Sequence, residues 1–370
     1  MIFKKDSEKR FHFDKPLFII SGIILIFGLI MLYSASIAVG FERFGDANYF
    51  IKKQMIYLVI GLVLMFVVYK IDYHFFEKWS LILFIFSIFL LLLVLFQGFG
   101  IEGQGAQRWL NLGIFGFQPS ELVKLTLILY MGAWLSERGQ SVIGSLKGGL
   151  FPFVSVLIVL AFLIIKQPDL GSLIIICAIG IAMFFLGGAS IKHIFAIIVA
   201  MGLSVAAAIA LAPYRMRRLM SFIDPSLDPQ GAGYHIKQAL LAVGSGGFLG
   251  LGLGQSRQKF LYLPEVVGDS LFAVIAEELG FVFSIIIILL FLGFFWRSIV
   301  ISRKAPDNFG KLVAIGIGTW ICLQAFVNIG AMLGILPLTG LTLPLMSYGG
   351  SSLIVTMISV GILLNISKRA

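Results

Sequence analysis

Near its C-terminus the chain runs from Leu312 to Ser367, a stretch of 56 residues, without a single Asp, Glu, Lys or Arg. In a soluble domain about a quarter of the residues are charged. A helix needs roughly 20 apolar residues to cross the hydrocarbon core of a bilayer, so this stretch is long enough for two crossings. Pro337, Gly340 and Pro344 lie near its middle, and these residue types interrupt helices. The stretch therefore predicts two transmembrane helices with a short connection between them.

Similar charge-poor runs recur along the whole chain, which is 59% hydrophobic and 12% charged. Such a composition excludes a soluble enzyme, a disordered chain and a nucleic-acid-binding domain, because an aqueous fold could not bury so much apolar surface. We predict an all-α integral membrane protein, a polytopic bundle of about ten transmembrane helices with one large extracytoplasmic loop. The predicted spans are 16–40, 54–70, 79–98, 119–136, 148–165, 169–188, 191–212, 270–296, 312–335 and 344–366.

The distribution of Lys and Arg orients these spans, because cytoplasmic loops are enriched in both residues. Sixteen of the 28 lie on the side of the two termini, and five lie in the short loops on the other side. Both termini are therefore expected in the cytoplasm. The predicted organisation is a cytoplasmic N-terminal tail over 1–15, seven helices over 16–212, a large extracytoplasmic loop over 213–270, three helices over 271–366 and a cytoplasmic C-terminal tail over 367–370.

The loop before the fourth span contains Arg108 and Trp109, and the span itself carries Glu121 and Lys124. Arg108 either holds the chain at the membrane interface or binds the phosphate of a lipid-linked ligand. Glu121 and Lys124 are three residues apart and share one helical face. They either neutralise each other as a structural pair or bind a polar ligand. Pro119 fits the first turn of this helix.

The long loop begins with a basic cluster of Arg215, Arg217 and Arg218, followed by two Asp-Pro turns. An amphipathic helix is expected over 233–243. The glycines of 244–254 fit neither the dinucleotide fingerprint nor the P-loop, which argues against a nucleotide site. They predict a close approach of two backbone segments, or a re-entrant turn that lines a cavity.

Four carboxylates surround the start of the eighth span. If the segment is helical, Glu265 and Asp269 stack as i and i+4, and Glu277 lies about 80° round from Asp269. A low dielectric raises the pKa of a carboxyl and suits it to proton transfer, although acids also favour helix N-termini for their charge alone. Glu277 and Glu278 lie too deep for free hydration, so a structural hydrogen bond across helices is expected rather than catalysis.

Six segments resemble the SEDS family (shape, elongation, division and sporulation), whose members share a ten-span topology. They are GAQRWLNLG, FQPSELVKL, RRLMSFIDPSLDPQGAGYHIKQALLAVGSGG, GLGQSRQKFLYLPE, DSLFAVIAEELGF and GILPLTGLTLPLMSYGGSSL. The fourth is more similar to the cell-division and sporulation members than to the elongation member. Many members have His-Thr-Asp-Phe where this chain has Val267-Gly268-Asp269-Ser270.

The resemblance implies a peptidoglycan glycosyltransferase that polymerises lipid II at the outer face of the cytoplasmic membrane, for septal cell-wall synthesis. The 4-hydroxyl of one lipid II GlcNAc attacks the MurNAc anomeric carbon of another lipid-linked chain. Undecaprenyl pyrophosphate leaves, and the α bond becomes a β-1,4 bond. By match to the family's catalytic aspartate, Asp269 is the expected general base. Since the leaving group needs positive charge, the expected substrate-binding residues include six cations together with two acids: Arg108, Lys124, Arg215, Arg217, Arg218, Lys259, Glu121 and Glu265.

Glu265 is expected to tune Asp269 or to help hold a divalent cation, Mg²⁺ or Mn²⁺, at the pyrophosphate. Cys177 and Cys322 lie in apolar runs and the four His are scattered, so the chain shows no dedicated metal-ligand set, and no organic cofactor is expected. The resemblance further implies a single-span class B penicillin-binding protein (a transpeptidase) as partner. Other divisome proteins and membrane lipids are expected partners too, at the division septum of a bacterial cytoplasmic membrane.

Two other functions stay open, a lipid II flippase and a non-catalytic scaffold for the transpeptidase. A flippase needs charged residues along a continuous path through the bilayer, whereas the ionisable groups here gather toward the outer side. A scaffold would leave Asp269 dispensable. The sequence therefore favours the polymerase, then the flippase, then the scaffold.

Overall fold

The computed structural model describes residues 13–96, 100–103, 106–111 and 116–369, and all ten predicted spans form helices. They are α1 (Lys15–Phe44), α2 (Tyr49–Lys70), α3 (His74–Val94), α4 (Pro119–Ser136), α6 (Phe151–Lys166), α7 (Leu170–Leu186), α8 (Ile191–Ala210), α11 (Leu271–Lys304), α12 (Asn308–Met332) and α13 (Gly350–Ser367). Seven of them, and the continuous helical segment Leu146–Lys166 that ends with α6, are long and apolar enough to cross a membrane. The chain is therefore a multi-pass membrane protein, as predicted.

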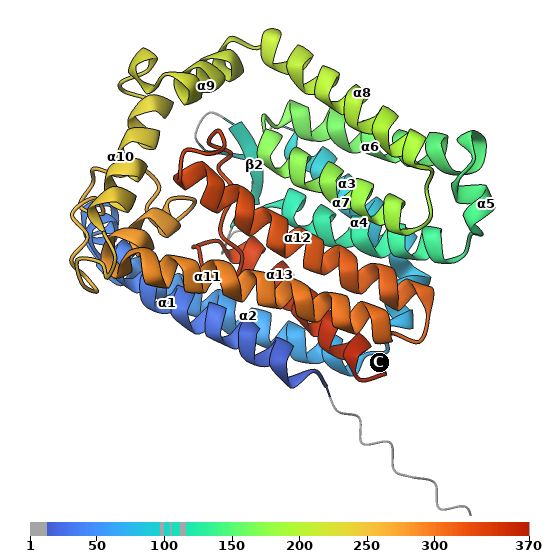
Figure 1. Ribbon diagram of the computed structural model, residues 1–370. Helices are drawn as coiled ribbons and strands as arrows, with labels where there is room; N and C mark the ends of the chain where they lie inside the picture. The colour runs from blue at the N-terminus through green and yellow to red at the C-terminus, as the bar shows by residue number, and fades with distance from the viewer. Residues whose placement is uncertain (1–12, 97–99, 104–105, 112–115, 370) are drawn as a thin grey trace, which may run out of the picture.

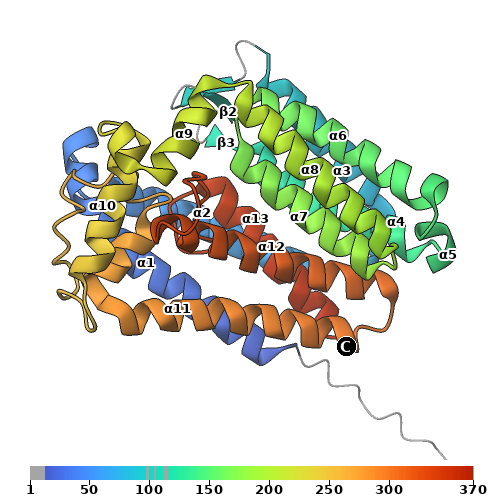
Figure 2. The ribbon, with the colours of Figure 1, turned by 45° about the horizontal axis from the view of Figure 1, so that its top comes forward.

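The bundle has two halves that meet along α4 and α12 (Figures 1 and 2). One half contains α1, α2, α11, α12 and α13, and the other contains α3, α4, α6, α7 and α8. Nearly every side chain of α13 is buried, which places this helix at the centre of the molecule. By contrast, Ile197 is the one buried side chain among those described on α8, so α8 lies at the periphery with its apolar surface turned to lipid.

Both ends of the described chain lie at the same end of the bundle (Figure 1). The backbone N–H of Asp14 donates to Ser367 Oγ at 3.0 Å, and the Arg297 guanidinium pairs with the Asp14 carboxylate. A chain that crosses the membrane an even number of times has both of its ends on the same side. The segments that follow α8 and precede α11 lie at the opposite end.

The predicted long loop folds into short elements rather than into open coil. It contains α9 (Pro213–Ile223), a 3-10 turn η2 (Pro225–Leu227) and α10 (Ala232–Ser245). Asp224 caps the turn by accepting a hydrogen bond from the backbone N–H of Ser226 at 3.0 Å. The amphipathic helix expected over 233–243 is confirmed as α10.

Two features differ from the predicted pattern. A three-stranded antiparallel sheet of β1 (Gly100–Gly103), β2 (Ala106–Asn111) and β3 (Gly116–Phe117) precedes α4, although only helices were expected. Short helices were also missed at the other end, where α5 (Gln140–Ile143) and the π-helical turn η1 (Leu146–Leu150) lead into α6. The strands and these turns are too short to leave a periodic hydrophobic pattern in the sequence.

Candidate active site

Asp269 lies in a turn over 264–270, directly before α11, and three hydrogen bonds from elsewhere in the fold hold this turn. Asn328 of α12 donates through Nδ2 to the Asp269 carbonyl at 2.8 Å. The backbone N–H of Tyr348, between α12 and α13, donates to the Val267 carbonyl at 2.8 Å. Ser270 Oγ lies 2.6 Å from His235 Nε2 of α10. The position of Asp269 therefore depends on three separate elements.

The helical stacking of Glu265 and Asp269 is wrong, because residues 264–270 form a turn. Glu265 has a φ of 49°, in the left-handed region that ends a regular helix. Its carbonyl instead accepts from the N–H of Gly268 at 2.9 Å and of Ser270 at 3.2 Å. α11 begins only at Leu271.

The surroundings of the half-buried Asp269 raise the pKa of its carboxyl to about 7. Burial is the largest cause, because it disfavours the charged form. The negative charge of Glu265 raises this pKa further, and the positive charge of Arg218 on α9 lowers it. A carboxyl with such a pKa can accept a proton near neutral pH.

A cavity of about 150 Å³ brings together three of the predicted arginines, Arg108, Arg215 and Arg218. They come from β2 and α9, and Pro337 and Thr339 of the α12–α13 connection line the same cavity. Because β2 and α9 are far apart in the sequence, the sequence alone did not predict that these arginines line one cavity. The cavity concentrates positive charge where a phosphate group could bind.

Backbone carbonyls fix two of these arginines. Arg108 donates through Nε to the Gln167 carbonyl at 3.0 Å and through Nη2 to the Pro168 carbonyl at 2.5 Å. Arg215 donates through Nη1 to the Ala208 carbonyl at the end of α8, at 3.1 Å. Each guanidinium has five N–H donors, of which Arg108 uses two in these bonds.

Arg217 does not join this group. It is exposed on α9 and does not line the cavity, although both Arg215 and Arg218 do. Since α9 is helical, consecutive side chains point about 100° apart. The structure therefore separates Arg217 from its two neighbours.

Glu121 and Lys124 form a buried pair instead of an open binding site. Lys124 Nζ lies 2.6 Å from Glu121 Oε1 and 2.7 Å from Gln324 Oε1 of α12. The exposed fractions are 0% for Lys124 and 3% for Glu121, so a ligand could reach them only after a rearrangement. Among the described residues, Glu121 Oε2 has no hydrogen-bond partner. Of the two readings left open by the sequence, this geometry favours the structural pair.

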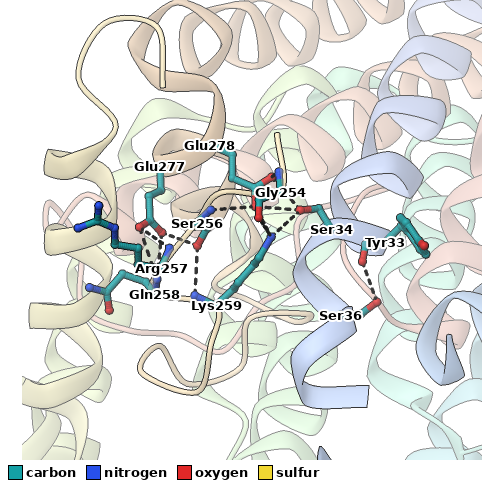
Figure 3. A network of polar contacts seen from close by, with 10 residues as sticks. All are labelled: Tyr33, Ser34, Ser36, Gly254, Ser256, Arg257, Gln258, Lys259, Glu277 and Glu278. Carbon is teal, nitrogen blue, oxygen red and sulfur yellow. Dashed lines mark hydrogen bonds and ion pairs between the residues drawn. The ribbon is translucent and has the colours of Figure 1, made fainter. Parts of the chain in front are cut away.

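Lys259 is also buried, which is at odds with the predicted substrate contact. Its ammonium lies 2.7 Å from Glu278 Oε1, 2.8 Å from the Gly254 carbonyl and 3.0 Å from Ser34 Oγ of α1. These three acceptors match the three N–H donors of a lysine. The network is drawn in Figure 3. Lys259 therefore ties the long loop to α1 and α11.

Glu277 and Glu278 serve the same network, as the hydrogen bond predicted across helices requires. Glu278 accepts from Ser34 Oγ at 2.8 Å, which links α11 to α1. Glu277 accepts from Ser256 Oγ and from the N–H of Arg257 at 2.9 Å. Both carboxylates bind the loop that follows α10 (Figure 3).

The glycines of this loop allow the close backbone approach that the sequence predicts. At Gly250 an added Cβ atom would lie 2.1 Å from the Glu278 carbonyl oxygen. The φ of this residue, 80°, lies in the left-handed region that favours glycine. Gly280 breaks the regular geometry inside α11 with a φ of 75°. The N–H of Phe281 then donates to the Gly247 carbonyl at 2.9 Å, so the loop replaces part of the helix's own hydrogen bonding.

Sequence reasoning missed Asn328, His235 and Ser270 as residues that hold the Asp269 turn. Asn328 did offer a signal, since an amide inside an apolar span usually makes a specific contact. Among the described residues, no group of three or more His, Cys, Asp or Glu side chains could hold a metal ion. The described donor set therefore does not fit a protein-held divalent cation.

Comparison with known proteins gives strong matches over nearly the whole chain. The model of the FtsW, RodA and SpoVE family, described as cell cycle protein, matches residues 15–370. Stage V sporulation protein E of Bacillus subtilis (strain 168) is 43% identical over 98% of this chain and 99% of its own length. A probable peptidoglycan glycosyltransferase FtsW of Thioalkalivibrio sulfidiphilus is 44% identical over 94% of this chain and 87% of its own length.

Solved structures agree with the sequence matches. A chain from a structure described as the structural coordination of polymerization and crosslinking by a peptidoglycan synthase complex has a TM-score of 0.80 and 29% identity. It covers 96% of this chain and 97% of that chain. The rod shape determining protein RodA of Thermus thermophilus has a TM-score of 0.71 and 27% identity, over 96% of this chain and 97% of its own. The predicted similarity to the division and sporulation members is confirmed.

Proposed function

The chain belongs to the FtsW, RodA and SpoVE family of cell cycle proteins, and on that premise we propose that it is a peptidoglycan glycosyltransferase with Asp269 as its general base. The substrate is lipid II, and the product is a β-1,4 glycan strand for septal wall synthesis. Its curated relatives carry the name of this activity. A carboxyl with a raised pKa and a cavity lined by arginines support this proposal.

One observation supports this assignment above the others: Arg218 connects the base to the cation cavity. It lines the cavity with Arg108 and Arg215, and its charge also acts on the Asp269 carboxyl. Asp269 thus lies within range of the charge of one arginine that lines the cavity. Transfer of a sugar from a pyrophosphate needs both, a base for the attacking hydroxyl and positive charge for the leaving group.

The reaction divides between these groups as follows. The 4-hydroxyl oxygen of the acceptor GlcNAc forms the new bond to the anomeric carbon of the donor MurNAc. The proton of the GlcNAc 4-hydroxyl moves to the Asp269 carboxylate, and the bond between the MurNAc anomeric carbon and the pyrophosphate oxygen breaks. The electron pair leaves with undecaprenyl pyrophosphate, whose charge Arg108, Arg215 and Arg218 balance. Attack opposite the leaving group converts the α linkage into a β linkage.

A divalent cation has no assigned place in this reaction. The described residues provide no ligand cluster for one, so the proposal uses the arginines for charge balance. Mg²⁺ or Mn²⁺ carried by the pyrophosphate itself stays a separate expectation. Removal of divalent cations by chelation, with wild-type polymerisation as readout, tests it.

The partner and the orientation belong to the same proposal. A similar chain occurs in a peptidoglycan synthase complex that couples polymerization to crosslinking. By analogy, this chain pairs with a class B penicillin-binding protein that crosslinks its strands. Both termini face the cytoplasm and the Asp269 turn faces outward, as the Lys and Arg distribution predicts.

Polymerisation of purified lipid II tests the function directly. The wild-type chain and Asp269→Asn are compared, each in complex with the cognate transpeptidase, after exclusion of glycan synthesis by the partner alone. Glycan strands from wild type but not from the variant are the expected result, provided that the variant elutes as a folded complex. Strands from both would remove Asp269 as the base, and strands from neither, with a working control enzyme, would favour the flippase or the scaffold.

A further inference from the structure

We infer that His235 is a positioning residue for the proposed polymerisation, and that it acts by holding the hydroxyl of Ser270 next to Asp269. This inference rests on the proposed function. His235 lies on α10, 35 residues before Ser270 in the sequence. The contact thus joins the long loop to the turn that carries the base.

The hydrogen-bond geometry defines the direction of this contact. Ser270 Oγ lies 2.6 Å from His235 Nε2 and 2.7 Å from the Pro264 carbonyl oxygen. A hydroxyl has a single hydrogen to donate, and a carbonyl can only accept. Ser270 therefore donates to Pro264, and His235 donates from Nε2 to Ser270. This assignment requires the imidazole tautomer that carries its proton on Nε2.

The charge state of His235 agrees with this role. Burial first, and then the positive charge of Arg218, lower the pKa of the imidazole to about 4. The ring is therefore neutral at the pH of the reaction, and Nε2–H can donate without adding a charge beside the base. The charged groups facing this contact are Arg218 of α9 and Asp269 and Glu265 of the turn.

Through Ser270, this contact helps to hold the two ends of the turn that carries Asp269. Ser270 Oγ bonds back to Pro264, at the other end of the turn, and lies 3.5 Å from Asp269 Oδ1. Asn328 of α12 holds the Asp269 carbonyl. Loss of the His235 bond leaves the Ser270 oxygen without its donor, so the hydroxyl and the Asp269 carboxyl beside it are held less firmly.

A double-mutant cycle with a conservative variant tests this assignment. The variants are His235→Ala, Ser270→Ala, the double variant and His235→Gln, whose side-chain amide can donate from a similar place. Lys237→Ala is the matched control, because Lys237 lies exposed on the same helix. Rates of lipid II polymerisation are measured with the cognate transpeptidase bound, and kcat and KM are determined separately.

The expected result is a fall in kcat of about 3- to 10-fold for His235→Ala, the size of one neutral hydrogen bond. KM should stay within about 2-fold, because neither side chain is in the cation cavity. The double variant should be no slower than Ser270→Ala alone, since that substitution already removes the bond to His235. His235→Gln should recover most of the rate, and Lys237→Ala should match wild type.

Three outcomes would overturn the inference: unchanged kcat in His235→Ala, no recovery in His235→Gln, or a double variant whose loss is the product of the single losses. Each would leave the proposed function intact, because wild type would still make glycan and Asp269→Asn would not. Absence of glycan from wild type, in an assay where a control enzyme works, would instead overturn both.

Discussion

At the scale of single residues, the proposed chemistry depends on Asp269 and Arg218. Burial and the negative charge of Glu265 raise the pKa of the Asp269 carboxyl, and the positive charge of Arg218 lowers it. These influences place its pKa near the pH at which a general base works best, since such a base must be largely ionised and still basic. Three predictions follow from this environment.

The first prediction concerns pH. Asp269 acts as a base only when it is deprotonated, so kcat/KM should rise with pH through a midpoint of about 7. At pH 6 the rate should be roughly 10-fold below its plateau, because one carboxyl in about ten is then ionised. Polymerisation rates between pH 5.5 and 8.5 check this. A flat profile over that range would contradict the assignment of the base.

The second prediction concerns stability. The pKa of Asp269 is raised in the folded protein from 3.8 to about 7, so the folded state binds more protons than the unfolded state between these values. The free energy of unfolding therefore falls as pH rises through this window, and the penalty is complete above about pH 7. Asp269→Asn removes this penalty, because an asparagine does not ionise. The melting temperature of this variant in detergent should exceed that of wild type at pH 8 and equal it at pH 4; a lower value at pH 8 would count against the raised pKa.

The third prediction compares two neighbouring arginines. Arg218→Ala removes a cation from the cavity and should lower kcat/KM for lipid II about 10- to 100-fold, as loss of a charged hydrogen bond does. Arg217→Ala removes an exposed cation outside the cavity and should change kcat/KM less than about 2-fold. Steady-state rates of the two variants check the contrast. Equal losses would show that general positive charge matters rather than the cavity.

At the scale of elements, the loop between α10 and α11 is held as a fixed structure. Gly250 brings the loop against the backbone of α11, where a larger residue would collide with the Glu278 carbonyl. Lys259 then joins this loop to both α11 and α1 through Glu278 and Ser34. The first turns of α11, which follow Asp269 directly, therefore cannot shift without breaking buried polar contacts.

The fourth prediction follows from this network. Lys259→Met leaves Glu278 buried without its cation, a change that costs about 3–5 kcal/mol in other proteins. The melting temperature should fall well below that of wild type, while KM for lipid II at a temperature where the variant is folded should stay within about 2-fold. Lys237→Met, on an exposed site of α10, serves as control. A raised KM with an unchanged melting temperature would restore Lys259 as a substrate contact.

At the scale of the whole molecule, the two termini lie at one end of the bundle, and α9, α10 and the start of α11 lie at the other (Figure 1). The Asp269 turn directly precedes α11, and two arginines of the cation cavity come from α9. The two ends are separated by the length of the helices, so they must lie on opposite faces of the membrane. Only the absolute orientation depends on the Lys and Arg distribution. The proposed function requires the Asp269 end to face outward, where lipid II is polymerised.

The fifth prediction tests this orientation. Cys177 and Cys322 are buried, so a single cysteine can be placed in a background without them. A cysteine at Lys237, exposed on α10, should react with a membrane-impermeant maleimide in intact cells. One at Lys147, exposed at the other end, should react only after lysis. Ser256, in the same long loop as Lys237, is unsuitable because its side chain is fully buried. The reverse labelling pattern would show that the topology is inverted.

The sequence by itself determined the membrane class and the ten helices, and it singled out Asp269 as the candidate base. Hydropathy and helix-breaking residues are local properties, so the spans could be predicted from short windows. Pro119 was expected in the first turn of its helix, and the structure places it there with Gln118 as the N-cap. Asp269 was identified by its motif, which is also local.

Only the tertiary structure decided which charged residues meet. Arg108 and Pro168 are 60 residues apart, Asn328 and Asp269 59, and Ser34 and Glu278 244. Sequence patterns give the type of each side chain but not the partner that will lie opposite it after packing. In an apolar bundle each buried charge must find such a partner, so the fold assigned Lys259, Lys124 and Glu121 to buried pairs. It left Arg108, Arg215 and Arg218 around the cavity, where a ligand can reach them.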